Sequence, residues 1–576
     1  MSLALVGLMW VLPFLHYRHQ YPLTTFEQEW LSALIGVLSL TLLLTGDYWQ
    51  APRLPRIVQL PAALIALVLL QSALGMMAYF DQSLLYLLYL LFAMMLMMLG
   101  ARLREVFGLD VLAAVLAGFL LAGAEFSALI GVLQHYRWHS WLDSVVVMKV
   151  ATGVYGNLAQ PNHFANYIAL GLISLGLLFG QRKLPAGFAV LLALPLLLVL
   201  TLSGSRSSWL YLLLMLLLAW RGIKTLPQLR PVMHYCLLLL AGFAVMHGVV
   251  QLPFMKGAGS NFDLFQRVAD TSSGGIRLQL WHEAWLIFKQ SPWLGAGFGQ
   301  FGWQHFQLGP VLRQANMNGL YNNAHSLLFQ LAAETGIAGL LVLFTALAVW
   351  FKGVRADSAA HWWGYAVLGV LVIHSMLEYP LWYLYFLAVA AVLLGMLDET
   401  HYRLQLRGVG RLSVAAILLL GLLSLIELKI GYQQLKDTLA IRPVSGNVAS
   451  AFERTRDGLI QVHNGALLRP YADLFMAAYF EVSDEKLAAK LAVNSNLSRF
   501  IPIAPVVYRQ ACLLAQSGQL EAARRVYEQA MWAYPANQEA RAQLVKLAQK
   551  DPAHFAALLE FALKTEQEYA SAIHNK

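Results

Sequence analysis

The sequence predicts an all-α polytopic membrane protein, with about 13 transmembrane helices and a helical C-terminal domain outside the membrane. Hydrophobic residues make up 59% of the 576 residues and charged residues only 12%, against roughly 25% charged in a typical globular protein. Runs such as Leu60–Tyr79, Ser83–Ala101 and Leu327–Trp350 carry almost no charge. Each run is close to, or longer than, the roughly 20 residues that a spanning helix needs.

The apolar runs, taken in chain order, define the predicted spans. They lie near residues 2–16, 30–46, 57–79, 83–101, 109–133, 164–180, 185–202, 208–220, 233–251, 326–350, 362–377, 381–397 and 412–430. The first run, Leu3–Leu15, lacks a basic flank and an Ala-x-Ala cleavage site. We therefore interpret it as a membrane helix and not as a cleaved signal.

Basic residues predict which side of the membrane each loop faces, because Lys and Arg are enriched in cytoplasmic loops. With Met1 in the cytoplasm, the even-numbered loops should be basic. These loops carry Arg53 and Arg56; Arg102 and Arg104; Arg182 and Lys183; Arg221, Lys224 and Arg230; Lys352 and Arg355; and Arg403, Arg407 and Arg411. The short opposite loops 80–82 and 378–380 carry no basic residue. Many of the residues behind the net charge of +9 thus orient the protein, and no nucleic-acid partner is expected.

Four unusual polar stretches share the outer face in this orientation: 154–165, 203–208, 252–325 and 378–383. The longest, 252–325, is rich in Gly and aromatic residues and contains a helical Arg-x-x-x-Trp pattern. A connection of this length inside a compact protein is usually functional or disordered, and its Trp and Phe content argues against disorder. We predict that it is the active-site loop.

The chain changes character after the last apolar run, where charges of both signs interleave. We predict a transmembrane domain at 1–430 and an outer α-helical domain at 431–576. The small, apolar, turn and terminator positions of a tetratricopeptide helix pair are occupied by Ala511, Leu514, Gly518, Ala523, Tyr527, Ala530 and Pro535. One repeat cannot bury its own face, so 439–499 is expected to supply neighbouring helices. A generic α-hairpin domain without a partner is the alternative.

Arg206 is the first candidate site residue. It lies where a predicted span begins, among small residues that include Ser203, Gly204 and Ser208. Small residues let a ligand approach the backbone closely, which favours an anion-binding arginine. The alternative is an arginine that anchors the helix to lipid phosphates.

Arg277 is the second candidate, because it follows Ser272-Ser273-Gly274-Gly275 at the predicted start of a helix. Backbone N–H groups and the dipole at a helix N-terminus favour anions, and a planar guanidinium binds phosphate oxygens bidentately. The same segment places Leu280, Trp281, Ala284, Trp285 and Phe288 at helical spacing. This spacing also fits a helix that lies in the membrane interface.

His325 is the third candidate and directly precedes an apolar run. Histidine titrates near neutral pH and is the commonest general base. The preceding Asn322 and Asn323 and the following Glu334 give it polar neighbours in the sequence. A structural histidine at the membrane interface is the alternative.

No metal site and no cofactor are expected. His16-x-x-His19 and His135-x-x-x-His139 have plausible ligand spacings, but few acidic residues lie near them. The two cysteines, Cys236 and Cys512, imply no disulfide framework. Because a Gly-x-Ser-x-Gly elbow, a P-loop and a dinucleotide fingerprint are all missing from the sequence, neither ATP-driven transport nor ordinary serine hydrolysis is supported.

Five sequence blocks carry a family resemblance. They are QPNHFANYIALGL (160–172), LTLSGSRSSWLYLL (200–213), RLQLWHEAWLIFKQSPWLGAGFGQF (277–301), NNAHSLLFQLAAETGIAGL (322–340) and HSMLEYPLWY (374–383). The chain resembles the pilin-glycosylating O-oligosaccharyltransferases of bacteria, within the superfamily of O-antigen ligases and O-antigen polymerases. The third and fourth blocks are typical of that superfamily. The Gln-Pro-Asn-His and Glu-Tyr-Pro motifs are typical of its protein-glycosylating branch.

The resemblance implies a multi-pass, GT-C-like glycosyltransferase of the bacterial inner membrane, with its active site and C-terminal domain facing the periplasm. The implied reaction is metal-independent and inverting. It transfers a whole glycan from an undecaprenyl-pyrophosphate-linked oligosaccharide donor to Ser or Thr of an acceptor pilin or another periplasmic protein. Membrane lipids are further expected partners.

The matching motifs imply roles for particular residues. Arg206 and Arg277 are expected to stabilise charge on the pyrophosphate leaving group, and His325 to act as general base. Five residues are expected to bind substrate: Gln160, Asn162, His163, Glu378 and Tyr379.

Two other functions remain open at this point. An O-antigen ligase, which transfers polysaccharide to lipid A core, shares the arginines and the histidine, although the large outer domain favours a protein acceptor. A transporter or flippase predicts ionisable groups near mid-membrane and internal repeats. The sequence shows neither feature.

Overall fold

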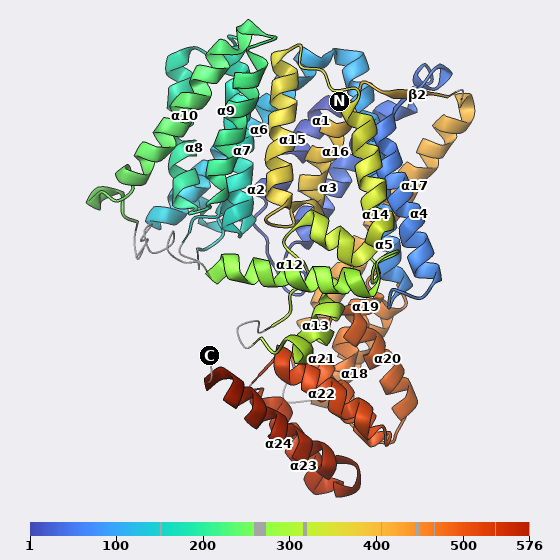
Figure 1. The fold of residues 1–576 in the computed structure, drawn as a ribbon. Coiled ribbons are helices and arrows are strands. Elements are labelled where there is room, and N and C mark those ends of the chain that lie inside the picture. The colour runs from blue at the N-terminus through green and yellow to red at the C-terminus, as the bar shows by residue number, and fades with distance from the viewer. Residues whose placement is uncertain are drawn as a thin grey trace. The chain divides into compact units, whose positions relative to one another are not determined.

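The computed structural model of the chain describes residues 1–149, 153–257, 272–314, 319–404, 406–443, 448–465, 467–535 and 537–574. Within these residues the predicted all-α class is confirmed (Figure 1). The strands described are β1 (Arg53–Pro55) and β2 (His401–Arg403), an antiparallel pair with Leu54 opposite Tyr402.

The helices account for nearly all of the regular structure. The first ten are α1 (Ser2–Met9), α2 (Leu12–Leu15), α3 (Phe26–Ser39), α4 (Gln59–Ala73), α5 (Phe80–Phe107), α6 (Leu109–Tyr136), α7 (Pro161–Gly180), α8 (Ala186–Leu202), α9 (Ser207–Gly222) and α10 (Arg230–Val249). Then follow α12 (Ser272–Gln290), α13 (Phe301–Leu312), α14 (Leu327–Phe351), α15 (Ala359–Ser375), α16 (Leu384–Leu397) and α17 (Arg407–Leu439). The last are α18 (Val448–His463), α19 (Arg469–Ala477), α20 (Leu487–Phe500), α21 (Ala504–Gln516), α22 (Leu520–Ala533), α23 (Gln538–Lys550) and α24 (Pro552–His574).

Every predicted apolar run coincides with a helix. Eight helical segments in the described part of the chain are long and apolar enough to cross a membrane. Shorter apolar helices occupy Ser2–Leu15, Ala186–Leu202, Ser207–Gly222 and Leu384–Leu397, and α15 occupies the predicted run 362–377. The chain is therefore a membrane protein by helix length and composition, and the total of 13 spans stays a prediction.

The chain forms two compact units. The first contains Met1–Ala63, Tyr89–Ser273 and Val342–Leu425, and the second contains Leu64–Leu88, Gly274–Leu341 and Ile426–Lys576. Each unit is assembled from segments that are distant in sequence, so neither corresponds to a single continuous stretch of the chain.

The first unit is built around α7. This helix contacts α6, α8, α9, α10 and α15, and most of its residues are buried. It carries no charged residue, and its small residues let neighbouring helices approach closely. A Cβ added at Gly171, for example, would lie 2.2 Å from the Cβ of Ala124 in α6. The Gln-Pro-Asn-His motif thus begins one of the most deeply buried helices of the unit.

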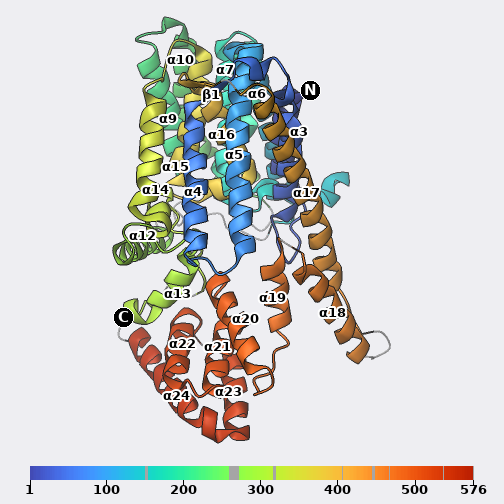
Figure 2. The same cartoon turned by 90° about the vertical axis from the view of Figure 1, so that its right-hand side faces the viewer.

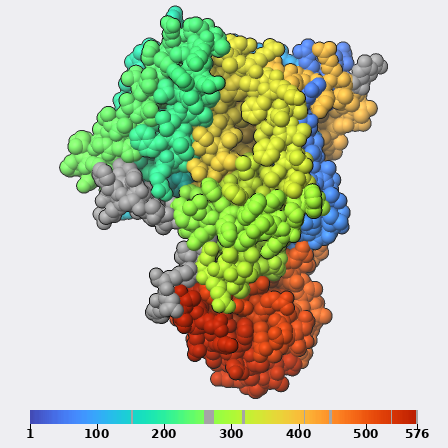
Figure 3. Space-filling model, viewed as in Figure 1, coloured from blue at the N-terminus to red at the C-terminus, as the bar shows by residue number. Residues whose placement is uncertain are grey.

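The helices α8 and α10 form part of the outer surface of the same unit (Figure 3). Leu191, Leu238 and Val245 on these helices are all more than half exposed. An apolar surface of this kind is expected of a helix that faces lipid, since lipid tails are as apolar as the side chains themselves.

The second unit contains a helical C-terminal array. Helices α20, α21, α22 and α24 pack side by side (Figure 2). The predicted helix pair at 507–535 is observed as α21 and α22, with Ala511, Ala523, Tyr527 and Ala530 buried between helices. The tetratricopeptide assignment itself stays a prediction.

Helix α13, from the predicted active-site loop, shares a core with this array. Phe306 is buried in the same cluster as Val507, Tyr508 and Tyr527. The backbone adds a further link, because Gly319 N–H donates to the carbonyl of Ala533 at 2.7 Å. Residues 258–271 and 315–318 of the predicted loop lie outside the described residues.

Candidate functional site

The start of α7 is fixed by the Gln-Pro-Asn-His motif itself. Gln160 is the N-cap residue, and its Oε1 accepts a hydrogen bond from the backbone N–H of His163 at 2.5 Å. Pro161 occupies the first helical position, where its fixed φ suits the helix and its missing N–H has no helical partner to lose. Gln160 therefore has a capping role alongside the substrate-binding role predicted for it.

Asn162 joins this motif to the Glu-Tyr-Pro motif. Its Nδ2 donates to Oε1 of Glu378 at 2.8 Å, and Glu378 is 4% exposed. The ring of Tyr379 packs edge-on against the His163 ring, with centroids 5.9 Å apart. Burial and the neighbouring Glu378 raise the pKa of Tyr379. The structure thus brings all five predicted substrate-binding residues together, Gln160 included.

His163 begins a buried chain of hydrogen bonds through three helices. Its Nδ1 lies 2.8 Å from Nε2 of His374 on α15, and Nδ1 of His374 lies 3.0 Å from the hydroxyl of Tyr211 on α9. His163 is 2% exposed, and His374 and Tyr211 are both fully buried. The helices α7, α9 and α15 pack against one another.

Arg206 lies in the same unit as these residues, as the exposed N-cap residue of α9. Gly204 before it has a φ of +65°, a conformation that glycine adopts at little cost. A backbone hydrogen bond links the end of α8 to the 154–165 stretch, since Val154 N–H donates to the carbonyl of Leu202 at 3.1 Å. Two of the four predicted outer stretches are therefore neighbours.

Arg277 lies in the second unit, near the start of α12. The helix buries Leu280, Ala284 and Ile287 in one cluster and leaves Trp285 47% exposed. The predicted amphipathic helix is therefore present. On its buried side, Oε2 of Glu283 lies 2.6 Å from Nδ1 of His305 in α13.

His325 also lies in the second unit, and its backbone has a φ of +51°. This left-handed conformation is uncommon for a residue with a side chain and tends to persist where the surroundings fix it. Here, Ala324 N–H donates to Oε1 of Gln330 at 2.6 Å. Nε2 of Gln330 donates in turn to Oε1 of Glu334 at 2.9 Å.

Glu334 links the histidine motif to the Gly-x-Gly motif. Its Oε1 also accepts the N–H of Phe301 at 3.1 Å, and its backbone carbonyl accepts the N–H of Gly297 at 3.1 Å. A Cβ added at Gly295 would lie 2.2 Å from the backbone carbon of Glu334, which explains the glycine. Gln330 of the His-Ser-x-x-x-Gln-x-x-x-Glu motif is thus a clamp on the backbone at Ala324, the residue before His325.

Sequence reasoning missed several of these residues as site candidates. His374, Gln330 and Glu334 stand inside the quoted motifs. The available signal was a polar residue that recurs at helical spacing within an apolar run. Tyr211 and Glu283 also stand inside the quoted blocks, but nothing in the sequence indicated their partners His374 and His305.

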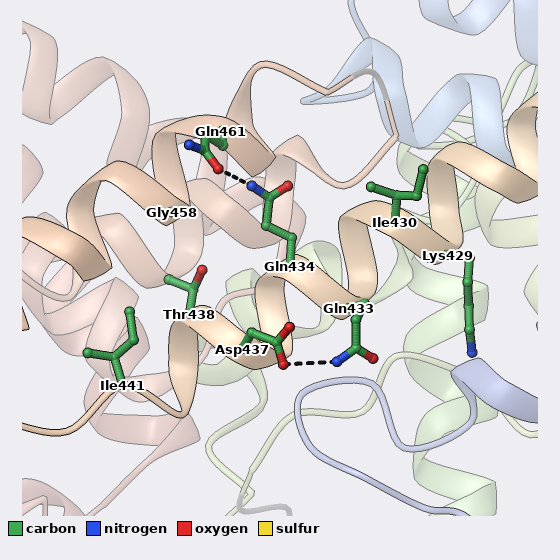
Figure 4. A pocket seen from close by; sticks show the side chains of 9 residues that line it. All are labelled: Lys429, Ile430, Gln433, Gln434, Asp437, Thr438, Ile441, Gly458 and Gln461. Atoms are coloured by element: carbon green, nitrogen blue, oxygen red, sulfur yellow. Dashed lines mark hydrogen bonds between the residues drawn. The ribbon is translucent and has the colours of Figure 1, made fainter.

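An open groove of about 770 Å³ lies elsewhere in the second unit, between the end of α17 and α18 (Figure 4). Its polar side chains bond one another: Gln434 donates to Gln461, and Gln433 donates to Asp437 at 2.9 Å. None of the predicted site residues lines it.

Among the described residues, no group of three His, Cys, Asp or Glu side chains could hold a metal ion. His19 instead bonds the carbonyl of Asn157 at 2.7 Å, and His135 bonds that of Met255 at 2.9 Å. Metal independence of the reaction stays a prediction.

Three known protein families match successive parts of the chain. Residues 154–179 match the protein glycosylation ligase family, and residues 188–344 match the O-antigen ligase family. Residues 362–549 match the C-terminal region of the membrane-bound polymerases described as virulence factors. The first match contains the Gln-Pro-Asn-His motif, and the second contains Arg206, Arg277 and His325.

Two curated relatives come from Acinetobacter baylyi. The chain is 26% identical to its general O-oligosaccharyltransferase over 443 residues, which is 73% of this chain and 74% of the relative. It is 23% identical to the ComP-specific O-oligosaccharyltransferase over 388 residues, 64% of this chain and 67% of the relative. These matches confirm the resemblance that the motifs indicated, and with it the enzyme class, a glycosyltransferase.

Proposed function

We propose that this chain is a protein O-oligosaccharyltransferase of the bacterial inner membrane. It transfers a glycan en bloc from undecaprenyl pyrophosphate to Ser or Thr of a periplasmic acceptor protein such as a type IV pilin, with inversion and without a metal. The observation that carries the proposal is the similarity to the general O-oligosaccharyltransferase over 73% of the chain. The protein glycosylation ligase match at 154–179 favours a protein acceptor.

The proposed mechanism needs little covalent help from the protein, because pyrophosphate is already a good leaving group. It needs positive charge where the leaving group develops negative charge, and preorganised cations supply this. Arg206 and Arg277 have that role in the proposal. The acceptor hydroxyl loses its proton to His325, which acts as general base. Gln160, Asn162, His163, Glu378 and Tyr379 bind substrate.

The orientation follows from the basic loops. The active site and the domain at 431–576 face the periplasm in this proposal, because the cytoplasmic loops are the basic ones. A large helical domain on that side suits the recognition of a protein acceptor. The second candidate, an O-antigen ligase acting on lipid A core, is supported by the match at 188–344.

The test is the intact mass of a candidate pilin, co-expressed with the protein in a strain that makes an undecaprenyl-pyrophosphate-linked glycan. We expect a mass increase of one glycan. The increase should disappear in Arg277→Ala and in His325→Asn, because asparagine tolerates the left-handed backbone but supplies no base. His325→Asn should still bind donor.

His282→Ala is the matched control, since His282 is an exposed histidine on α12 with no proposed role. It should glycosylate like the wild type. If polysaccharide appears on lipid A core while the pilin mass is unchanged, the ligase function is correct. Full activity of His325→Asn would exclude the general-base role.

A further inference from the structure

Two arginines face one another on the small sheet. Arg53 of β1 is opposite Arg403 of β2 in the antiparallel pair, and both residues are exposed. Directly opposite residues point to the same face of a sheet, with Cβ atoms about 4.5–5.5 Å apart, and like charges in such a pair are destabilising. An anion bound between the two guanidinium groups would remove this cost.

The acidic residues nearest to this pair in the sequence have other partners. Asp47 and Glu399 form ion pairs with two arginines of α5, at 3.0 and 2.5 Å. Asp398 accepts a backbone N–H just after β1, at 2.8 Å. In the part of the chain that the structure describes, no carboxylate forms an ion pair with Arg53 or Arg403. The compensating anion is therefore expected to come from outside the chain.

The strand pair lies where two candidate membrane spans begin. Arg56–Ala73 and Gly408–Leu439 are both long and apolar enough to cross a membrane. The strand β1 ends directly before the first of these segments, and β2 ends five residues before the second. The two arginines are therefore expected at the level of the lipid headgroups. In the proposed orientation this is the cytoplasmic leaflet, whose anionic lipids attract basic segments.

An open groove at the start of α17 adds a third arginine and apolar surface. The groove has a volume of about 530 Å³ and is lined by Gly46, Trp49, Gln50, Gly408 and Arg411. Trp49 packs closely against α17, because a Cβ added at Gly410 would lie 2.0 Å from its ring. Val409 and Leu412, beside the groove, are 69% and 71% exposed. Exposed apolar side chains next to an arginine suit a ligand that carries acyl chains as well as an anionic group.

We propose that Arg53, Arg403 and Arg411 bind the headgroup of an anionic phospholipid, with its acyl chains along the exposed apolar side of α17. A planar guanidinium binds phosphate oxygens bidentately. The bound phosphate offsets the repulsion between Arg53 and Arg403, so the lipid stabilises the β1–β2 pair. Only the choice of leaflet rests on the proposed function; the site itself does not depend on the glycan donor or the acceptor.

The first experiment titrates phosphatidylglycerol onto the full-length protein in a neutral detergent and measures bound lipid by native mass spectrometry. Arg53→Gln combined with Arg403→Gln should weaken binding about tenfold, because both phosphate-binding groups are removed. Arg221→Gln combined with Lys224→Gln is the matched control. It removes the same charge from two exposed residues of another basic loop, and it should bind within about twofold of the wild type.

Thermal unfolding of Arg53→Glu separates lipid binding from a folding defect. This change turns the like-charged pair into an opposite-charged pair, so the variant should melt at or above the wild type without lipid. Phosphatidylglycerol should raise the melting temperature of the wild type, because a ligand that binds only the folded state stabilises it. It should not raise that of Arg53→Glu. Phosphatidylcholine and inorganic phosphate should leave the wild type unchanged.

Three results would overturn the inference. The first is equal affinity of the wild type and the double glutamine variant, and the second is an equal loss in the matched control, which would indicate non-specific attraction. The third is stabilisation by inorganic phosphate as large as that by phosphatidylglycerol, which would assign the site to a soluble anion. Each result leaves the proposed function intact if the wild type still glycosylates a pilin.

Discussion

Asn162 and Glu378, 216 positions apart in the chain, are joined by a hydrogen bond of 2.8 Å from the amide Nδ2 to the carboxylate Oε1. This bond connects the start of α7 to the segment between α15 and α16. Two motifs that the sequence shows separately are therefore one structural element.

Exchanging the amide and the carboxylate between Asn162 and Glu378 tests whether their hydrogen bond positions the two motifs. Asn162→Asp should place two carboxylates together, lower the melting temperature and reduce transfer strongly, since a hydrogen bond to a charged group is worth about 1.5–3 kcal/mol. Adding Glu378→Gln restores one donor and one acceptor. We expect the double variant to recover much of the melting temperature. A double variant no better than Asn162→Asp would show that the bond is not what couples the motifs.

The Gln330 clamp predicts a loss of activity without loss of the fold. Gln330→Ala leaves the buried N–H of Ala324 without its acceptor, which costs about 1–3 kcal/mol and releases the strained His325 backbone. Transfer should fall at least tenfold, with donor binding retained. Gln290→Ala, at an exposed position on α12, is the control. Unchanged turnover in Gln330→Ala would mean that the His325 conformation does not depend on the clamp.

The buried Glu283–His305 pair predicts a strong asymmetry between single and double changes. His305→Ala leaves the buried Glu283 carboxyl group without its hydrogen-bond partner, and leaving a buried polar group unsatisfied costs about 1–3 kcal/mol. Glu283→Leu combined with His305→Phe removes both polar partners and should change the stability less. Thermal unfolding of the full-length protein measures both. Equal destabilisation by the single and the double variant would contradict this account.

Asp551 predicts a small, pH-dependent contribution from the C-terminal helices. A hydrogen bond from His554 lowers the pKa of Asp551. A lowered folded-state pKa stabilises the fold above the unfolded value of about 3.9, and the contribution is lost as the pH falls through the lowered value. Asp551→Asn should therefore melt slightly below the wild type at pH 7, and the difference should shrink as the pH falls below about 3.9. His554→Ala should reduce the same pH dependence; a difference in melting temperature that does not change with pH would assign it to helix capping instead.

The composition and the spacing of apolar residues predicted much of the fold. Every predicted apolar run became a helix, because a chain in lipid must satisfy its backbone hydrogen bonds internally. The amphipathic helix after Ser272 was equally visible, since its apolar residues recur at helical spacing. The two-unit organisation was not visible, because it depends on contacts such as that of Phe306 with Val507, which no local pattern encodes.

The candidate site could be predicted in part. The motifs pointed to Gln160 and Tyr379, but nothing in them indicated that Asn162 bonds Glu378 or that His163 bonds His374. Such pairings depend on the angle at which two helices cross, and the periodicity of one helix does not determine that angle. Spacing alone also does not show which residues of a motif support the fold, as Gln330 does, and which take part in the reaction.

The shared core of α13 and the C-terminal array has a consequence for the order of biosynthesis. Phe306 leaves the ribosome long before its partners Val507 and Tyr527 have been translated, at roughly 5–20 residues per second. During that interval the aromatic ring of Phe306 lacks these packing partners, so the loop that carries His325 cannot reach its final packing. The enzyme becomes competent only when almost the whole chain has been made, and premature termination near residue 500 should yield an inserted but inactive protein.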